Sequence, residues 1–174
     1  GTTLFAADSK NIKTVYSEIN PLLQFLIQKR IAILQSNKTD RIRLSENLRN
    51  ISSKIIYNLR KFQPDQYLKE SYKTLFNSSK YFDSDVFGKI LKLRSYVDVV
   101  KLEDGLLADT LTIAILSALI PVSNLKKRGD VRFKTKKEIE KEKIEIEDFL
   151  PNKLTEMAED ISNKRMKATI RQIE

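Results

Sequence analysis

Apolar residues recur at every third or fourth position through most of this chain, and that spacing constrains the fold more than any other feature. The clearest run lies between Leu44 and Phe62, and another begins at Leu22. Residues that punctuate turns are scarce, because the 174 residues include only 4 Gly and 4 Pro. An all-β fold needs more turns than these residues supply. The sequence therefore predicts a chain that is mainly α-helical.

Local signals position the expected elements along the chain. A short helix over 3–9 precedes a β-prone run over 12–17 that ends at Glu18, and this run is the one strand we expect. Pro21 suits the first position of a helix that continues to about Ser36. Further helices are expected over 39–62 (capped by Thr39 or Asp40), 68–76, 83–97, 106–120 and 149–173, the last as one helix or a pair.

These elements divide the chain into four predicted segments. They are a partial α/β unit over 1–37, a helical region over 38–121, a basic loop over 122–137 and a charged, amphipathic helical segment over 138–174. The apolar run 106–120 contains Asp109 and is too short to cross a bilayer, so we interpret it as the buried centre of the helical packing, ended by Pro121. Because no signal-peptide pattern starts the chain, we expect a cytoplasmic protein without membrane contact.

Two residue types that carry much of enzyme chemistry are absent. The chain contains no Cys and no His. The lack of Cys excludes disulfides, thiolate zinc sites and cysteine nucleophiles. The lack of His excludes histidine-dependent hydrolytic triads and histidine-ligated metal sites. We therefore expect no metal in this chain.

The net charge of +9 is concentrated in two stretches. Residues 38–62 carry seven basic side chains against two acidic ones, and residues 123–137 carry seven against Asp130 alone. Such blocks are typical of proteins that bind polyanions such as DNA. A basic face that is merely solvated accounts for each block equally well, so both interpretations stay open.

The start of the chain has the order of a nucleotide-type cofactor site. Gly1 opens a short apolar helix, a β-prone run follows, and Glu18 ends that run. A Rossmann-like unit holds an adenosine in this order, with a tight turn at the helix start and a carboxylate on the ribose. An acid at the end of a strand is more often simply solvated, and that alternative applies to Glu18 taken alone.

The first 21 residues also carry a family pattern. Gly1-Thr2-Thr3-Leu4, the small pair Ala6-Ala7, Val15 and Glu18-Ile19-Asn20-Pro21 together resemble the amino-directed DNA methyltransferases, which act on adenine N6 or cytosine N4. The resemblance implies a fragment of an α/β Rossmann-like methyltransferase domain, followed by a helical insertion. It implies S-adenosylmethionine as cofactor, with Gly1, Thr2 and Thr3 against it and Glu18 on its ribose hydroxyls. Asn20 with Pro21 would turn the chain into the next helix and completes the implied cofactor-binding set.

The chain also departs from that family's pattern. The first cofactor motif of the family contains an Asp-Pro-Phe-x-Gly-x-Gly run, of which only the last glycine could be present here. Its catalytic motif contains a Pro-Pro pair that holds the flipped base, whereas the four prolines of this chain are all isolated. No catalytic residue is therefore assigned, and we expect the chain to be inactive alone. The implied partners are DNA and the remaining part of a methyltransferase, in a restriction–modification setting.

Basic residues near Gly129 and on the 39–62 helix are the candidate DNA contacts. Glycine permits a tight turn, and cationic side chains suit phosphates. The expected contacts are Lys126, Lys127, Arg128, Arg132 and Lys134 in the loop, with Arg41 and Arg49 on the helix. The alternative for the loop is a solvent-exposed connector whose charges pair with neighbours.

Aromatic residues follow the basic helix and leave a further choice open. Tyr67, Tyr72, Tyr81 and Phe82 could stack with single-stranded nucleic acid. Tyr72 and Phe76 lie on a helical apolar stripe, however, so core packing is the favoured interpretation. The rival to the methyltransferase interpretation as a whole is a non-enzymatic, basic helical module that binds nucleic acid or acts as a protein scaffold.

Overall fold

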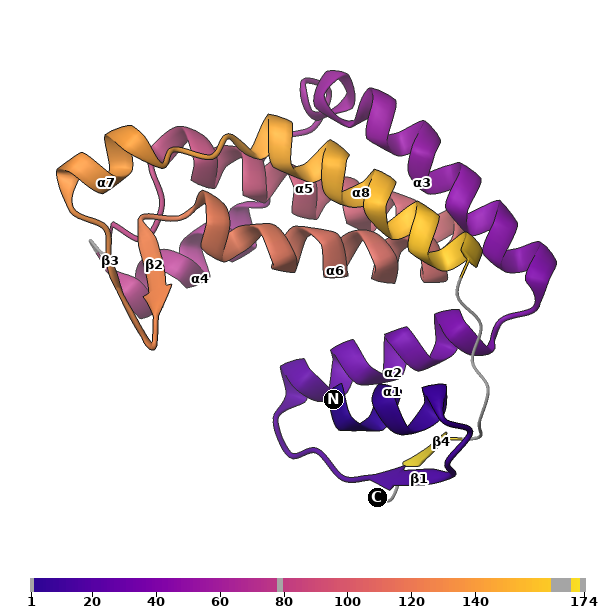
Figure 1. Ribbon diagram of the computed structural model, residues 1–174. Coiled ribbons are helices and arrows are strands. Elements are labelled where there is room, and N and C mark those ends of the chain that lie inside the picture. The colour runs from indigo at the N-terminus through magenta and orange to yellow at the C-terminus, as the bar shows by residue number, and fades with distance from the viewer. Residues whose placement is uncertain (1, 78–79, 164–169, 173–174) are drawn as a thin grey trace. The chain divides into compact units, whose positions relative to one another are not determined.

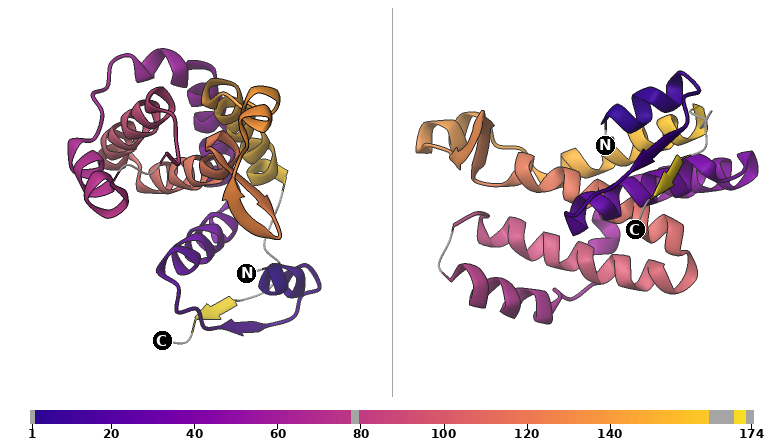
Figure 2. Two further views of the ribbon diagram at one scale, coloured as in Figure 1. Left: turned by 90° about the vertical axis from the view of Figure 1, so that its left-hand side faces the viewer. Right: turned by 90° about the horizontal axis from the view of Figure 1, so that it is seen from below.

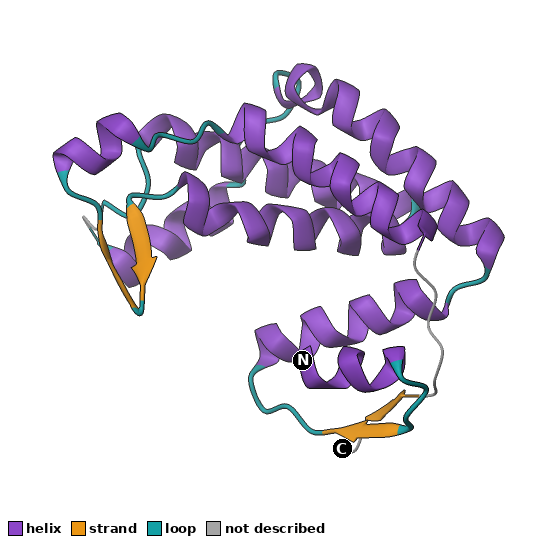
Figure 3. Ribbon diagram, viewed as in Figure 1, coloured by secondary structure: helices purple, strands orange, loops and turns teal. Residues whose placement is uncertain are grey.

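The computed structural model describes residues 2–77, 80–163 and 170–172, and it confirms a mainly helical chain (Figure 3). Two small two-stranded sheets accompany the helices. In chain order the elements are α1 (Thr2–Ser9), β1 (Thr14–Tyr16), α2 (Pro21–Gln35), α3 (Lys38–Leu59), α4 (Gln66–Phe76), α5 (Ser84–Glu103), α6 (Gly105–Val122), β2 (Leu125–Arg128), β3 (Asp130–Phe133), α7 (Lys136–Lys141), α8 (Ile146–Asn163) and β4 (Ile170–Gln172).

The chain forms two compact units that do not follow the predicted segment boundaries. The first unit comprises Gly1–Asn47 and Met157–Glu174, and the second comprises Leu48–Glu156. Helices α3 and α8 each contribute residues to both units. The two units are described separately below.

The first unit is an α/β arrangement built on a parallel strand pair (Figure 1). Strand β1 pairs in parallel with β4, with Thr14 opposite Ile170 and Tyr16 opposite Gln172. Leu4 of α1 and Ile27 of α2 are buried together, and Tyr16 of β1 packs against them. The predicted helix over 149–173 is therefore wrong at Ile170, whose backbone belongs to a strand. Local periodicity could not show this, because the partner strand lies near the other end of the sequence.

Side-chain caps set the starts of two helices in this unit. The Oδ1 atom of Asn20 accepts hydrogen bonds from the backbone N–H groups of Leu22 (3.0 Å) and Leu23 (3.3 Å) at the start of α2. Asn37, rather than Thr39 or Asp40, caps α3: its Oδ1 atom accepts from the backbone N–H of Asp40 at 2.8 Å. The predicted cap lay two or three residues too late in the sequence. Asn37, directly before the first turn, accepts from one of the backbone N–H groups that lack a partner within the helix.

Helix α6 is the core of the second unit, as predicted for the apolar run 106–120. Its buried residues are Leu107, Ala108, Thr110, Leu111, Ala114, Ala118 and Val122. The helix continues one residue past Pro121 instead of ending before it, since a proline in the last turn removes only one hydrogen bond.

Helix α6 also meets the length and composition expected of a membrane-spanning helix, the one helix in the described part of the chain that does so. Its 18 residues have a mean hydropathy of 1.9. A core helix satisfies the same criterion, and the buried residues of α6 give it that role within its unit. The absence of membrane contact stays a prediction.

The segment predicted as a long basic loop is a β-hairpin followed by a short helix. Strands β2 and β3 pair antiparallel, with Lys126 opposite Arg132 and Lys127 opposite Val131. Gly129 makes the turn with φ of 75°, a left-handed conformation that favours glycine. The loop prediction was wrong because each strand has only four residues and most of them are charged, so the brief alternation at Val131 and Phe133 did not stand out as a strand.

Helix α7 accounts for the first part of the charged stretch 138–147. Thr135 and Glu138 form a reciprocal capping box at its start. Both residues lie next to the hairpin in sequence, and the views of Figure 2 show α7 beside β2 and β3. Helix α7 thus begins within the predicted basic loop and ends within the predicted charged segment, and its Glu138 pairs with Arg132 of the hairpin.

Candidate functional site

A cavity in the first unit joins two of the predicted cofactor residues. It has a volume of about 210 Å³ and lies at the first turn of α1 and the carboxyl end of β1. Its lining residues are Thr3, Leu4, Thr14, Val15, Tyr16, Ser17, Glu18 and Ile27. Thr3 and Glu18 therefore border one space, although fifteen positions of sequence separate them. Gly1 lies outside the described residues, and of Thr2 only the backbone is described.

The carboxylate of Glu18 is held in place by its own loop. Its Oε1 atom accepts a hydrogen bond from the backbone N–H of Asn20 at 2.9 Å. Within the described residues the Oε2 atom has no hydrogen bond, so it can accept one from a hydroxyl group of a ligand. Asn20 itself is absent from the cavity lining, because its side-chain oxygen caps α2. Asn20 therefore orients the Glu18 loop and starts the following helix.

Thr14 lines this cavity, and sequence reasoning missed it. Its Oγ1 atom is buried and has no hydrogen-bond partner within the described residues. A buried polar atom without a partner costs about 1–3 kcal/mol, so a ligand group that reaches it is favoured. A threonine at the start of a strand is common, and nothing local in the sequence distinguished this one. Beside it, burial raises the pKa of the Tyr16 phenol.

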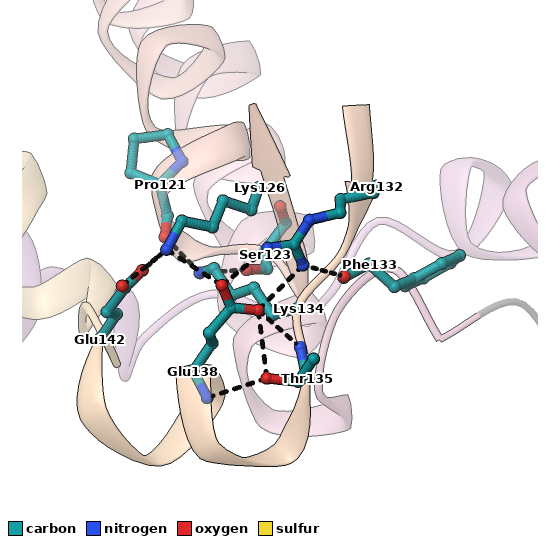
Figure 4. A network of polar contacts seen from close by, with 9 residues as sticks. All are labelled: Pro121, Ser123, Lys126, Arg132, Phe133, Lys134, Thr135, Glu138 and Glu142. Atoms are coloured by element: carbon teal, nitrogen blue, oxygen red, sulfur yellow. Dashed lines mark hydrogen bonds and ion pairs between the residues drawn. The ribbon is translucent and has the colours of Figure 1, made fainter. Parts of the chain in front are cut away.

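In the second unit, Glu138 of α7 and Glu142 at its C-terminal cap neutralise the charged face of the hairpin (Figure 4). Lys126 Nζ lies 2.6 Å from Glu142 Oε1 and 3.2 Å from Glu138 Oε1. The guanidinium of Arg132 binds both oxygens of Glu138, at 2.7 and 2.8 Å. The Arg132 hydrogen bonds, followed by the backbone N–H of Thr135, hold the pKa of the Glu138 carboxyl well below its ordinary value. Hydrogen bonds to Glu142 and then Glu138 raise the pKa of Lys126. Hydrogen bonds to Glu138 raise the pKa of Arg132.

Lys134 is also engaged within the chain. Its Nζ atom donates to the carbonyl oxygens of Ser123 (2.8 Å) and Pro121 (3.4 Å). These carbonyls belong to the end of α6, where a cation offsets the negative end of the helix dipole. Three of the five predicted cations of this segment thus have internal partners, which supports the connector alternative for them. Lys127 is exposed and makes no ion pair within the described residues, and the side chain of Arg128 is not described.

The two arginines predicted on the 39–62 helix differ in exposure. Arg41 is only 9% exposed, and its Nη1 atom donates to the Ser36 carbonyl oxygen at 2.6 Å. The expectation that Arg41 lies on an exposed basic face is therefore wrong, because its guanidinium donates to the backbone carbonyl that follows the last residue of α2. Arg49 is exposed and belongs to the other unit. The predicted DNA contacts are divided between the two units, with Arg41 in the first and the others in the second.

Comparison with known proteins gives no family assignment: no family model matches the chain, and neither a curated protein nor a solved structure matches it. Within the described residues no group of three Asp or Glu side chains is arranged to hold a metal ion.

Proposed function

We propose that this chain is the cofactor end and helical insertion of an amino-directed DNA methyltransferase. Such an enzyme transfers a methyl group from S-adenosylmethionine to an exocyclic amine of adenine or cytosine. The observation that carries the proposal is the shared cavity of Thr3 and Glu18 at the start of α1 and the carboxyl end of β1. Doubly wound α/β proteins bind their ligands at the carboxyl ends of parallel strands.

The chemistry of the cavity suits an adenosine. Glu18 would accept hydrogen bonds from the ribose hydroxyls through Oε2, while Oε1 stays bound to the loop N–H. Leu4 and Ile27 supply apolar walls. When bound, S-adenosylmethionine would supply the transferable methyl group. The chain's own residues would hold and orient its adenosine part.

The topology of the first unit supports the same proposal. A helix, a strand and a second helix are followed, after a long insertion, by a strand parallel to the first. Parallel pairs require such crossovers and are covered on both faces in most α/β proteins. Val15 of β1 is 57% exposed, as expected if another part of a methyltransferase domain covers the second face. That part would also contribute the catalytic motif, which this sequence lacks.

The helical second unit is proposed to contact DNA. Of the predicted contacts with described side chains, Lys127 and Arg49 are exposed and can reach phosphates. The setting that follows from the family resemblance is restriction–modification. Base flipping would bring the target amine to residues outside this sequence.

Nuclear magnetic resonance titration of the chain with S-adenosylmethionine tests the cofactor site. We expect backbone amide shifts at Thr3 and over 14–18, with a dissociation constant on the order of millimolar, since only part of an adenosine site is present. The Glu18→Gln variant should weaken binding roughly tenfold or more, because it removes a charged hydrogen-bond acceptor. Glu46→Gln, an exposed carboxylate of α3 in the same unit, is the matched control and should have no effect.

Two results would contradict this proposal. Unchanged binding in the Glu18→Gln variant, or no shifts at the cavity, would leave the basic helical nucleic-acid-binding module as the better interpretation. Micromolar binding by the chain alone would contradict the assignment of the rest of the cofactor site to another segment.

A further inference from the structure

The β2–β3 hairpin has two chemically different faces. Cross-strand partners and alternate residues of a strand share a face, so Leu125, Lys127, Val131 and Phe133 lie opposite the face of Lys126 and Arg132. The face of Lys126 and Arg132 is bound to the glutamates of α7. Figure 4 shows the ring of Phe133 directed away from that ion-pair network. The face that carries Phe133 is therefore the one left for a partner.

Aromatic rings continue from this face onto the neighbouring elements. The Phe133 ring stacks on the Tyr81 ring, with centroids 5.4 Å apart and planes 13° apart. Tyr81 in turn meets the edge of Phe76, the last residue of α4, at 5.5 Å. Phe133 is 52% exposed, Val131 56% and Phe76 43%. We call Phe76, Tyr81, Val131 and Phe133 the aromatic surface.

Hydrogen bonds hold Tyr81 in its stacked position. The backbone N–H of Asn124, at the base of the hairpin, donates to the Tyr81 carbonyl oxygen at 2.8 Å. The Asn124 side-chain amide donates to the Lys80 carbonyl oxygen and to Asp83 Oδ1, both at 3.1 Å. The segment before α5 is thus fastened to the hairpin, and the ring stack is formed before any partner binds. Such preorganisation lowers the entropic cost of binding.

Helix α4 extends the exposed apolar area. None of its residues is buried, although Leu68, Tyr72, Leu75 and Phe76 form an apolar stripe. Leu75 is 75% exposed, whereas Tyr72 is half-buried against Phe87 with ring centroids 4.5 Å apart. The interpretation of Phe76 as a core residue is therefore wrong, because α4 lies at the edge of its unit. Contiguous exposed apolar residues of this kind mark interaction sites.

The charges around the aromatic surface indicate the kind of partner. Lys127 shares the hairpin face, Lys73 lies one turn before Phe76, and Lys80 precedes Tyr81. All three are exposed and make no ion pair within the described residues. Of the nearby acids, Asp83 is bound to Asn124 and Asp130 belongs to the opposite hairpin face. Open aromatic faces beside unpaired lysines suit bases and phosphates together.

We propose that the aromatic surface binds unpaired bases of single-stranded DNA, with a base stacked on Phe133 and a phosphate at Lys127. This inference takes its DNA partner from the proposed function but uses a different site. The half-exposed ring of Phe133 already stacks on Tyr81 on one side, so a base on its outer side would extend an existing stack. Stacking of this kind is tolerant of sequence, so no base preference is expected.

Fluorescence anisotropy with a labelled oligothymidylate, compared with a duplex of the same length, tests this proposal. We expect tighter binding of the single strand and quenching of tyrosine emission, which is observable because the chain has no Trp. Phe133→Leu should weaken single-strand binding about tenfold, the effect of losing one stacked base. Lys127→Ala should lower the salt dependence by about 0.7 in the slope of log affinity against log salt.

Two matched controls separate this site from general effects. Tyr67→Leu removes an 83% exposed ring on the opposite side of α4 and should leave binding unchanged. Lys54→Ala removes an exposed lysine of α3 and should also have no effect. Circular dichroism checks the fold of Phe133→Leu, and Lys127→Ala tests the site without touching a packed residue.

Several results would overturn the proposal. They are equal affinity for duplex and single strand, an unaffected Phe133→Leu variant, or no oligonucleotide binding by the parent chain. A dimer that dissociates on Phe133→Leu, in sedimentation analysis, would instead assign the surface to a protein partner. Because Phe133 and Lys127 lie outside the Glu18 cavity, oligonucleotide binding should survive Glu18→Gln, so failure of one proposal leaves the other testable.

Discussion

At the scale of single residues, Glu138 pairs with two of the cations in the basic segment over 123–137. Its carboxylate binds Arg132, contacts Lys126 and accepts hydrogen bonds from the Thr135 backbone N–H (2.9 Å) and hydroxyl (3.1 Å). A count of charge along the sequence predicts a free cationic segment here. The glutamates that pair with it follow immediately in sequence, but only the turn into α7 directs them back onto the hairpin.

We expect Glu138→Gln to loosen the hairpin at neutral pH. The folded pKa of Glu138 is below its unfolded value, so its stabilisation is complete above about pH 4.3 and is lost as the pH falls through the folded value. The variant should therefore show faster amide exchange in β2 and β3 at pH 7. It should also show a weaker acid dependence than the parent chain.

Glu140→Gln is the control for this prediction, since Glu140 is exposed on the same helix and makes no ion pair within the described residues. Hydrogen exchange followed by nuclear magnetic resonance measures both variants. Equal exchange rates in the two variants would show that the ion pairs in Figure 4 do not stabilise the hairpin.

At the scale of elements, the sequence predicted the start of α2 but no strand pairing. Pro21 begins α2 as predicted, because proline suits a first turn whose N–H groups are free. The sequence did not predict the hairpin or β4, because their strands have only three or four residues, too few for a period to identify them. A strand is defined by its partner, whereas a helix satisfies its own backbone.

Asn20→Ala should lower the free energy of unfolding by about 1 kcal/mol, the usual effect of removing a helix cap. The two amides that Asn20 Oδ1 now accepts from would lose their partner at the start of α2. Urea denaturation measures the change. Asn50→Ala, at an exposed position within α3, should instead be neutral or slightly stabilising because alanine is the better helix former. A loss of stability as large as that of Asn20→Ala would mean that the cap is not the cause.

At the scale of the whole molecule, stability depends on the packing of α6 in the second unit. Leu111 is 1% exposed within this helix. We expect Leu111→Ala to cost roughly 2–5 kcal/mol in unfolding free energy, because the substitution removes buried surface and leaves a cavity. Leu102→Ala, at an 87% exposed position of α5, should change it by less than about 0.5 kcal/mol. Comparable effects of the two substitutions in urea denaturation would contradict the assignment of α6 as the core.

The candidate cofactor site could be predicted in part. The order of elements in the sequence pointed to Glu18, the family resemblance added Thr3, and both residues line the cavity. Asn20 was included with them, but its side-chain oxygen serves the start of α2. The unpaired hydroxyl of Thr14 could not be anticipated, since its burial results from packing around it.

The sequence by itself determined that the chain is mainly helical, where several helices begin and that α6 is the core. These features depend on residues within a few positions of one another, so the spacing of apolar residues and the capping residues are enough to predict them. Only the tertiary structure decided that β1 pairs with β4, that Arg41 is buried, and that α7 neutralises one face of the hairpin. Each of these depends on which elements come together in three dimensions, and a local pattern cannot specify that.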